Sequence, residues 1–347
     1  MKSSVSHPAL TLLLIGLILL GLIIGQNILI PLVMAFLLTY LIDILRRQVA
    51  KIRIKNWTPP KWMQMIISTL VLSGIIWFIG SLLIHNLKAF QKVAPEYNDR
   101  ILMHSKTIAQ QLDLPSLEEV TKELNISEIV GKVFNSSIAF LSATFVVVFY
   151  VVFLFLEEGI SLNKLKLAIP EKQRRQKLYD TIKKIDASMY KYFATKSFLS
   201  LIIGIITLIV LESFGVDFAF LWAFLAFLLN FIPFIGAFVA IVFPVLISFL
   251  QHGDPLISIS LLSVLVLIQV IMGNIIEPRV IGKSLNLSPL VVLLSLSFWG
   301  AIWGVAGMFL CVPITVTLMI VLNQFPNTKP YAIMLSAGHD IDAKKID

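Results

Sequence analysis

The chain has 347 residues, of which 58% are hydrophobic and only 14% charged, and its formal net charge is +8. A soluble domain carries about a quarter charged residues, so this composition excludes an ordinary soluble protein. Its apolar runs are long and do not alternate, which excludes barrel strands and predicts an all-α membrane protein of about eight spans. In such a protein the positive charge marks cytoplasmic loops and contact with anionic lipid, and nucleic acid is not an expected partner.

Four spans are expected in the first half of the chain, at residues 9–25, 27–45, 63–86 and 137–156. The first two are separated only by Gly25-Gln26 and are predicted to form a tight hairpin, which with the third span makes an N-terminal domain, 1–86. The loop 46–61 carries six Lys or Arg and no acid, so the positive-inside rule places it, and by counting back the N-terminus, in the cytoplasm. The first run lacks a signal-peptide cleavage motif and is predicted to be a retained span.

Two polar segments follow. Residues 87–136 balance acids and bases, and we expect an extracytoplasmic segment of two amphipathic helices divided at Pro115. It is either a hairpin lying on the membrane or a lid over a pathway. The domain 137–196 joins the fourth span to a basic cytoplasmic helix that is expected from Pro170 onward. That helix has a heptad-like apolar seam, which either lies on the inner leaflet or packs on the same helix of another subunit; its residues are Leu178, Ile182, Ile185, Met189 and Tyr192.

The C-terminal half, 197–322, has a different pattern. The spans 197–213 and 256–276 are each followed by an apolar run that is too long for one helix and is broken by glycine and proline. Each half therefore predicts one full helix followed by a hairpin of short helices. Because an odd number of crossings separates the halves, an inverted repeat is a hypothesis for this region. Residues 323–347 are expected to be a cytoplasmic tail.

A polar stretch, "GNIIEPRVIGKSLNLSP" at 273–289, lies between the apolar runs 256–272 and 290–299. Pro278 disfavours helix at the residue before it, so the span 256–276 is predicted to stop at Glu277, and Ser288-Pro289 has the pattern of a helix start. The connection is either an ordinary cytoplasmic loop or dips inward and brings Glu277 into a polar cavity. The residues expected to anchor it are Pro278, Arg279, Gly282 and Lys283.

Glu277 is the most informative carboxylate, because a charge inside the bilayer costs roughly 2.5 kcal/mol or more and is usually paired or functional. Arg279 is the expected partner. Glu277 then either fixes the loop or acts as a protonatable or cation-binding group. Asn230 either satisfies backbone freed at a proline kink or lines a pathway. The predicted transport pathway consists of Asn230, Pro233, Gly236, Gln269, Asn274, Glu277, Gly304, Gly307 and Pro313.

Three stretches carry a resemblance: "NFIPFIGAFVAIVFP" (230–244), "NIIEPRVIGKSLNLSPLVVLLSL" (274–296) and "GAIWGVAGMFLCVPITVTL" (300–318), led by "DASMYKYFATKSF" (186–198). Together they resemble the autoinducer-2 exporter family of multi-pass membrane proteins. One departure is Ala237, where the family often has a second proline. The resemblance implies about eight spans, a tendency to form homo-oligomers, and either export of a small furanosyl quorum signal or cation/proton antiport.

Enzyme functions find no support, because the chain has no P-loop, HExxH or GxSxG motif and no histidine pair at metal-ligand spacing. No cofactor or metal is expected. We therefore predict a secondary transporter that exports a small polar solute, with autoinducer-2 as one candidate, across the cytoplasmic membrane with both termini in the cytoplasm. The alternatives are a monovalent cation/proton antiporter that uses Glu277 and a non-transporting membrane scaffold. The expected partners are the solute or ion, lipid and a second copy of the chain.

Overall fold

The computed structural model describes residues 6–51, 59–112, 146–157, 164, 165, 167–281 and 286–338. The described part is almost entirely helical, and its one β-type contact is an isolated bridge between Leu287 and Ser336. Six helices in it are long and apolar enough to cross a membrane, which confirms the predicted all-α membrane protein; they are Gln26–Val49, Trp62–Met103, Lys172–Ser213, Ile235–His252, Pro255–Val280 and Pro289–Leu322. Three shorter apolar helices accompany them, Leu12–Ile24, Val146–Glu157 and Ala219–Leu229.

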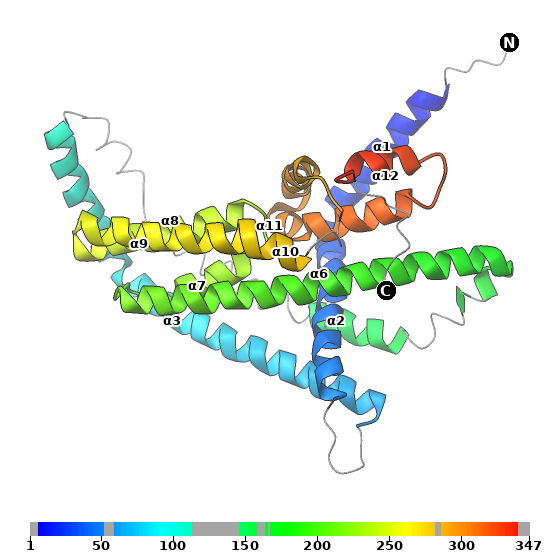
Figure 1. The fold of residues 1–347 in the computed structure, drawn as a ribbon, viewed down its shortest axis with the longest axis horizontal. Helices are drawn as coiled ribbons and strands as arrows, with labels where there is room; N and C mark the ends of the chain where they lie inside the picture. The colour runs from blue at the N-terminus through cyan, green and yellow to red at the C-terminus, as the bar shows by residue number, and fades with distance from the viewer. Residues whose placement is uncertain are drawn as a thin grey trace. The chain divides into compact units, whose positions relative to one another are not determined.

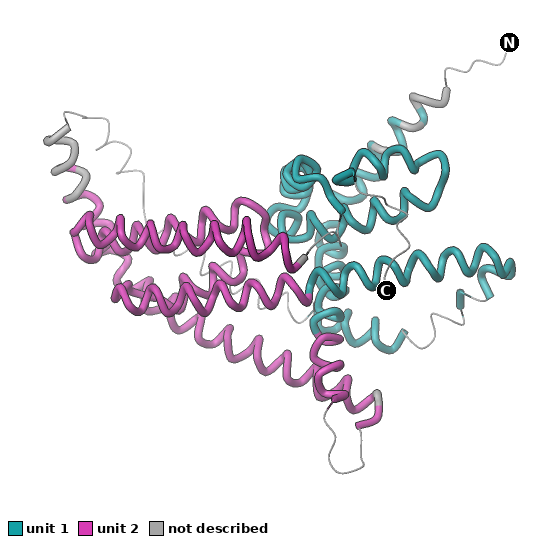
Figure 2. Tube along the Cα trace, viewed as in Figure 1, with its two compact units in different colours: residues 1–41, 144–193, 283–347 teal, residues 42–143, 194–282 magenta. Residues whose placement is uncertain are grey.

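The chain divides into two compact units (Figure 2). Unit 1 comprises residues 1–41, 144–193 and 283–347, and unit 2 comprises residues 42–143 and 194–282. Unit 2 contains the segments that form the candidate site.

The N-terminal helices α1 (Ser6–Ile24) and α2 (Gln26–Val49) follow one another without the predicted hairpin. Gly25 N–H donates to Gly21 O, and Leu29 N–H donates to Gly25 O, so helical hydrogen bonding continues through the junction. The ribbon bends there and does not double back (Figure 1). The prediction is wrong at this position because two antiparallel helices need a connection of about two to five residues, and only one residue separates these helices.

Helix α3 (Lys61–Leu112) is one helix of 52 residues. The predicted third span is its first part, and the predicted amphipathic segment from residue 87 continues it without a break up to Leu112. Residues 113–145, with the predicted division at Pro115, lie outside the described part of the chain. The distal part of α3 buries one face at helical spacing; its buried residues are Leu87, Phe90, Ala94, Tyr97 and Ile101.

Helix α6 (Lys172–Ser213) runs unbroken through 42 residues, or about 63 Å at 1.5 Å per residue. It begins two residues after Pro170, close to the predicted start, and the predicted boundary at 196–197 falls inside it. The apolar seam is divided, because Met189 and Tyr192 are buried whereas Leu178 and Ile182 are exposed. Both predicted settings of the seam, leaflet or subunit contact, stay predictions.

Helices α7 (Ala219–Leu229) and α8 (Ile235–His252) form a hairpin in unit 2. The start of α7 and the end of α8 are joined by the Gln251 side chain, which accepts a hydrogen bond from Asp217 N–H at 2.9 Å and donates to Gly215 O at 2.8 Å. The run 218–250 is therefore a helical hairpin whose two ends lie side by side. The arms meet so closely that a Cβ on Gly236 would lie 1.8 Å from Leu229 O.

The next segment comprises α9 (Pro255–Val270), a π-helical turn η1 (Ile271–Ile276) and α10 (Glu277–Ile281). Asp254 caps its start by accepting from Leu256 N–H. The predicted stop at Glu277 is wrong, because the helix continues through Pro278 to Ile281. Glu277 N–H donates to Met272 O, five residues earlier. A proline ring clashes with the carbonyl four residues before it, and we attribute its tolerance here to the wider π turn that immediately precedes it.

In unit 1, the helix labelled α11 (Pro289–Leu322) reverses at Gly304, whose φ of 60° and ψ of −139° are not helical. The two arms are joined by Ser295 Oγ, which donates to Cys311 O at 3.0 Å. A Cβ on Gly307 would lie 1.8 Å from Trp299 O, so this second hairpin uses the same glycine contact as the first. Pro289 starts the helix as predicted, but the Ser288 hydroxyl makes no cap bond.

The start of α11 and its turn both have partners within unit 1. Trp303 Nε1–H donates to Leu22 O of α1 at 3.0 Å. The last helix, α12 (Lys329–Leu335), lies against the start of α11, where Ser288 N–H donates to Leu335 O. The turn and the start of this hairpin are therefore each held by a hydrogen bond to another segment.

The core of unit 2 lies where α3, the end of α6 and both arms of the α7–α8 hairpin meet α9. It is rich in aromatic contacts, including Phe90 against Trp222 at 5.8 Å between ring centroids and Trp222 stacked on Phe243 at 6.0 Å. A smaller apolar cluster joins α6, α7, α8 and the π turn through Leu199, Ile203, Ala226, Ala240 and Met272. These two clusters hold the hairpin against α6 and bring its tip to the site described next.

Candidate functional site

A buried ion pair joins α6 to the start of α10. Lys196 Nζ donates to Glu277 Oε1 at 2.5 Å, and both residues belong to unit 2. The lysine side chain is 6% exposed and the glutamate side chain 24% exposed. Both residues lie within candidate membrane spans. The pair therefore neutralises two charges that would each be costly in the bilayer alone.

The predicted partner of Glu277, Arg279, is not its partner. Residues two positions apart on a helix do not face one another, and both residues lie on α10. Arg279 is exposed. The prediction failed because Pro278 was expected to end the helix. The helix continues through Pro278, so the side chains of Glu277 and Arg279 point in different directions.

One turn further along α6, a second polar contact joins the hairpin tip to the same helix. Asn230 Nδ2 donates to Ser200 Oγ at 2.8 Å, and Ser200 is fully buried. Asn230 ends α7, and Pro233 lies in the turn between the two arms. The Asn230 amide thus bonds a side chain of α6, so the expectation that it satisfies backbone freed at a kink is not what the structure shows.

The close approach of α7 to α6 depends on small residues. A Cβ on Gly204 would lie 3.0 Å from Phe227 Cβ and 3.4 Å from Ala223 O. Lys196, Ser200 and Gly204 follow one another at intervals of four residues, so they share one face of α6. That face presents an ammonium group, a hydroxyl and a bare backbone position toward the hairpin and the π turn.

The π turn positions Glu277. Such turns insert an extra residue into a helix and occur frequently at functional sites. Here the turn comprises Ile271–Ile276, directly before the carboxylate. The other predicted members of this stretch do not join the pair: Asn274 is exposed and Gln269 is half-buried on α9.

The pair retains unused hydrogen-bonding capacity. A lysine ammonium has three donors and a carboxylate has two acceptor oxygens, whereas the described residues supply one bond between them, at Oε1. The hydroxyl of Ser197, next to Lys196 on α6, is buried and has no hydrogen-bond partner within the described part of the chain. The site thus gathers a charge pair and a buried hydroxyl at one place between α6 and α10.

The remaining predicted pathway residues belong to unit 1. Gly304 forms the turn of α11, Gly307 makes the close arm contact and Pro313 is buried in the second arm. Of the predicted loop anchors, Pro278 and Arg279 are exposed on α10, and Gly282 and Lys283 lie outside the described residues. The structure therefore brings together Glu277, Asn230, Pro233 and Gly236, all of unit 2.

Lys196 and Ser200 were missed as site residues by sequence reasoning. Lys196 was expected only at the cytoplasmic mouth, as part of the segment 186–198, and Ser200 was not singled out. One signal pointed to the ion pair: Lys196 directly precedes the apolar run 197–213, and Glu277 directly follows the run 256–276. If these two runs are antiparallel spans, these positions lie at the same end, so opposite charges there are able to meet.

A second polar cluster lies where α7 begins and α8 ends. Tyr97 Oη donates to Asp217 Oδ2 at 2.6 Å. Arg100 Nη1 donates to the carbonyls of Leu250 and Gln251, both at 3.2 Å, near the C-terminus of α8. The distal part of α3 thereby bonds both the start of α7 and the end of α8, at the end of the hairpin opposite its turn.

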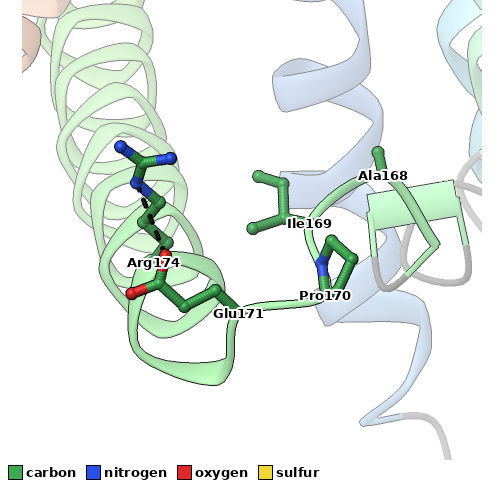
Figure 3. Close-up of a pocket in the computed structure, with 5 residues that line it drawn as sticks. All are labelled: Ala168, Ile169, Pro170, Glu171 and Arg174. Carbon is green, nitrogen blue, oxygen red and sulfur yellow. Dashed lines mark ion pairs between the residues drawn. The ribbon is translucent and has the colours of Figure 1, made fainter.

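A shallow open depression of about 460 Å³ lies at the N-terminal end of α6 (Figure 3). It is lined by Ala168, Ile169, Pro170, Glu171 and Arg174. Arg174 and Glu171 approach to 3.7 Å, but both side chains are more than half exposed, so the contact contributes little. The depression is remote in sequence from the ion pair and contains no other charged side chain, and we assign it no role.

Among the described residues, no group of three or more His, Cys, Asp or Glu side chains is arranged to hold a metal ion.

Comparison with known proteins agrees with this architecture. The family model described as AI-2E family transporter matches residues 12–327. A "Putative transport protein" of Haemophilus influenzae is 30% identical over 330 residues, which cover 91% of this chain and 93% of that protein. The AI-2 transport protein TqsA of Escherichia coli K12 is 28% identical over 335 residues, or 92% of each chain. The chain belongs to the AI-2E transporter family and is a multi-pass membrane transporter.

Proposed function

We propose that this protein is a secondary transporter that exports a small, uncharged polar solute across the cytoplasmic membrane. The observation that carries the proposal is the buried Lys196–Glu277 pair beside the Asn230–Ser200 contact. Polar and ionisable groups inside a membrane are costly and are retained chiefly along substrate or ion pathways. Here they lie on and beside the turn of the α7–α8 hairpin, and interrupted helices are a place where transporters build solute sites.

The geometry favours an uncharged solute. Because each charge of the pair neutralises the other, a solute entering the site meets no net charge. It meets hydrogen-bond donors from the Lys196 ammonium and the Asn230 amide, and acceptors from Glu277 and Ser200. A molecule rich in hydroxyl groups fits such a site. The similarity to TqsA, named an AI-2 transport protein, makes autoinducer-2 the first solute to try.

The proposal includes an orientation and an assembly. The basic loop 46–61 and the basic part of α6 favour the cytoplasmic side by the positive-inside rule, with both termini on that side. The exposed part of the α6 seam, at Leu178 and Ile182, offers a contact for a second copy of the chain.

The second candidate is a monovalent cation/proton antiporter that uses Glu277. The observation in its favour is that the carboxylate is partly exposed while its partner is not. A cation would have to displace the Lys196 ammonium to bind there, which makes this the weaker candidate. A scaffold with no transport activity does not explain why an ion pair between α6 and α10 is retained one helical turn from the Asn230–Ser200 contact.

The test uses purified protein in proteoliposomes, with labelled autoinducer-2 to follow solute flux and a trapped pH dye to follow protons. We expect solute flux in the wild type that is lost in Asn230→Ala and Glu277→Gln, and no proton movement on addition of Na⁺, Li⁺ or K⁺. Cation-driven proton movement without solute flux would establish the antiporter. Absence of both fluxes across a panel of small polar solutes would favour the scaffold.

A further inference from the structure

Lys196 is positioned to decide what Glu277 is able to bind. We infer that Lys196 is a specificity-determining residue: its ammonium occupies the cation position of the Glu277 carboxylate and thereby excludes free monovalent cations and protons from the pathway. The inference rests on the proposed function for the meaning of the pathway. The inference itself concerns only cation binding: Glu277 binds cations once the lysine charge is removed.

The contact itself is the first argument. Lys196 Nζ lies 2.5 Å from Glu277 Oε1, so the ammonium occupies the space that a bound Na⁺ or K⁺ would need. The lysine is 5% exposed as a residue and is carried by the unbroken helix α6. The Lys196 ammonium competes with free ions for the Glu277 carboxylate. Because it is part of the same chain, it acts at a high effective concentration that a free ion has to overcome.

The surroundings are the second argument. The apolar residues Leu199, Ile203 and Met272 belong to the buried cluster that joins α6 to the π turn. No other cation in the described part of the chain forms an ion pair with Glu277, and Arg279 is exposed on a different side of α10. Removing the lysine charge would therefore leave the carboxylate without a counter-ion in a largely apolar site.

A carboxylate left in that state must be neutralised. The Glu277 side chain is only 24% exposed, so an unpaired charge there is destabilising, and a proton or a small monovalent cation from solution would neutralise it. Loss of Lys196 should therefore convert a site that ignores cations into one that binds them. The expectation is a gain of function, which a lysine with a merely structural role would not predict.

The experiment measures cation binding directly. Purified Lys196→Gln protein in detergent is heated in 0 to 300 mM NaCl, with choline chloride used to hold ionic strength constant, and the unfolding temperature is recorded. We expect Na⁺ to raise this temperature in Lys196→Gln and not in the wild type, and we expect the response to disappear in the double variant Lys196→Gln/Glu277→Gln. Lys191→Gln is the matched control, because Lys191 is an exposed lysine on the same helix.

A second variant covers the case in which Lys196→Gln does not fold. Lys196→Cys is modified with aminoethyl methanethiosulfonate, which restores a positive charge at that position, and the charge is then removed by a reductant. The native cysteine, Cys311, is replaced by alanine in this variant, and the mass of the intact protein confirms that position 196, which is 5% exposed in the wild type, has been modified. We expect the Na⁺ response to be absent in the modified protein and to appear on reduction.

Two results would overturn the inference. One is a folded Lys196→Gln or reduced Lys196→Cys protein that shows no Glu277-dependent response to Na⁺, Li⁺ or K⁺. The other is a wild-type protein that already shows that response. Neither readout requires solute flux, so failure of the proposed transport function and failure of this inference are separate results.

Discussion

Replacing Gly236 by alanine tests whether the α7–α8 hairpin has to be closed for this protein to work. A Cβ at this position would lie 1.8 Å from Leu229 O and 2.4 Å from Leu229 C, and both are backbone atoms that no rotamer change can move. Ordinary contact begins at 3.4 Å, so the two arms would have to separate by 3.4 minus 1.8, or 1.6 Å.

This displacement has two consequences. Overpacking a well-packed core typically costs about 1–3 kcal/mol, and a backbone-to-backbone clash belongs at the upper end of that range or above it. In addition, Asn230 lies directly after the clashing residue and its amide is 2.8 Å from Ser200 Oγ. A shift of more than 1 Å there would break that hydrogen bond, because the donor and acceptor would then lie beyond bonding distance.

The assay compares Gly236→Ala with Gly74→Ala. Gly74 lies on α3 with no atom within 4 Å of a built Cβ and with an ordinary helical backbone, so alanine there should be neutral or stabilising by up to about 1 kcal/mol. Thermal unfolding in detergent should show a clear loss of stability for Gly236→Ala and none for Gly74→Ala. Solute flux in proteoliposomes should fall for the first variant alone.

The reasoning would be refuted if Gly236→Ala unfolded at the temperature of Gly74→Ala and retained its flux. Reduced stability with full flux would refute only the link between the closed tip and transport.

Three further substitutions test individual contacts. Tyr97→Phe removes the hydroxyl that bonds Asp217 and should lower the free energy of unfolding by about 1 kcal/mol, whereas Tyr179→Phe, at an exposed tyrosine of α6, should change nothing. Ser200→Ala leaves a partly buried amide donor at the hairpin tip unpaired and should cost about 1–3 kcal/mol and reduce flux; unchanged flux would remove this contact from the pathway. Trp303→Phe removes the indole N–H that joins the turn of α11 to α1 and should cost about 1 kcal/mol, and retention of full thermal stability would show that the bond contributes nothing.

Much of this protein was predictable from local sequence. Long apolar runs indicate helices in lipid, because every backbone polar group must be bonded within the helix there. The glycines and prolines at 230–236 and 300–313 predicted hairpins in place of straight spans, and the structure turns the chain back at Asn230–Phe234 and at Gly304. Glu277 and Asn230 were identified as candidates because polar side chains are rare and costly in such runs.

The failures share a cause. The hairpin expected at Gly25 and the helix stop expected at Glu277 were judged from single residues, whereas the backbone continued its hydrogen bonding through both positions. A π turn is a property of several successive carbonyls, and no residue type in "IMGNII" marks it. Because helix continues from this π turn into α10, Arg279 does not face Glu277.

The sequence by itself determined that this is a helical membrane protein with two interrupted hairpins and one carboxylate that needs a partner. Only the tertiary structure decided which partner that is, because Lys196 and Glu277 are 81 residues apart and meet through the antiparallel packing of α6 against the α9–α10 segment. Periodicity and propensity report interactions over a few residues, whereas an ion pair between two helices depends on how each helix is rotated about its axis. On α6 and the π turn, that rotation is consistent with the contact of Gly204 with α7 and with the apolar cluster of Leu199, Ile203 and Met272.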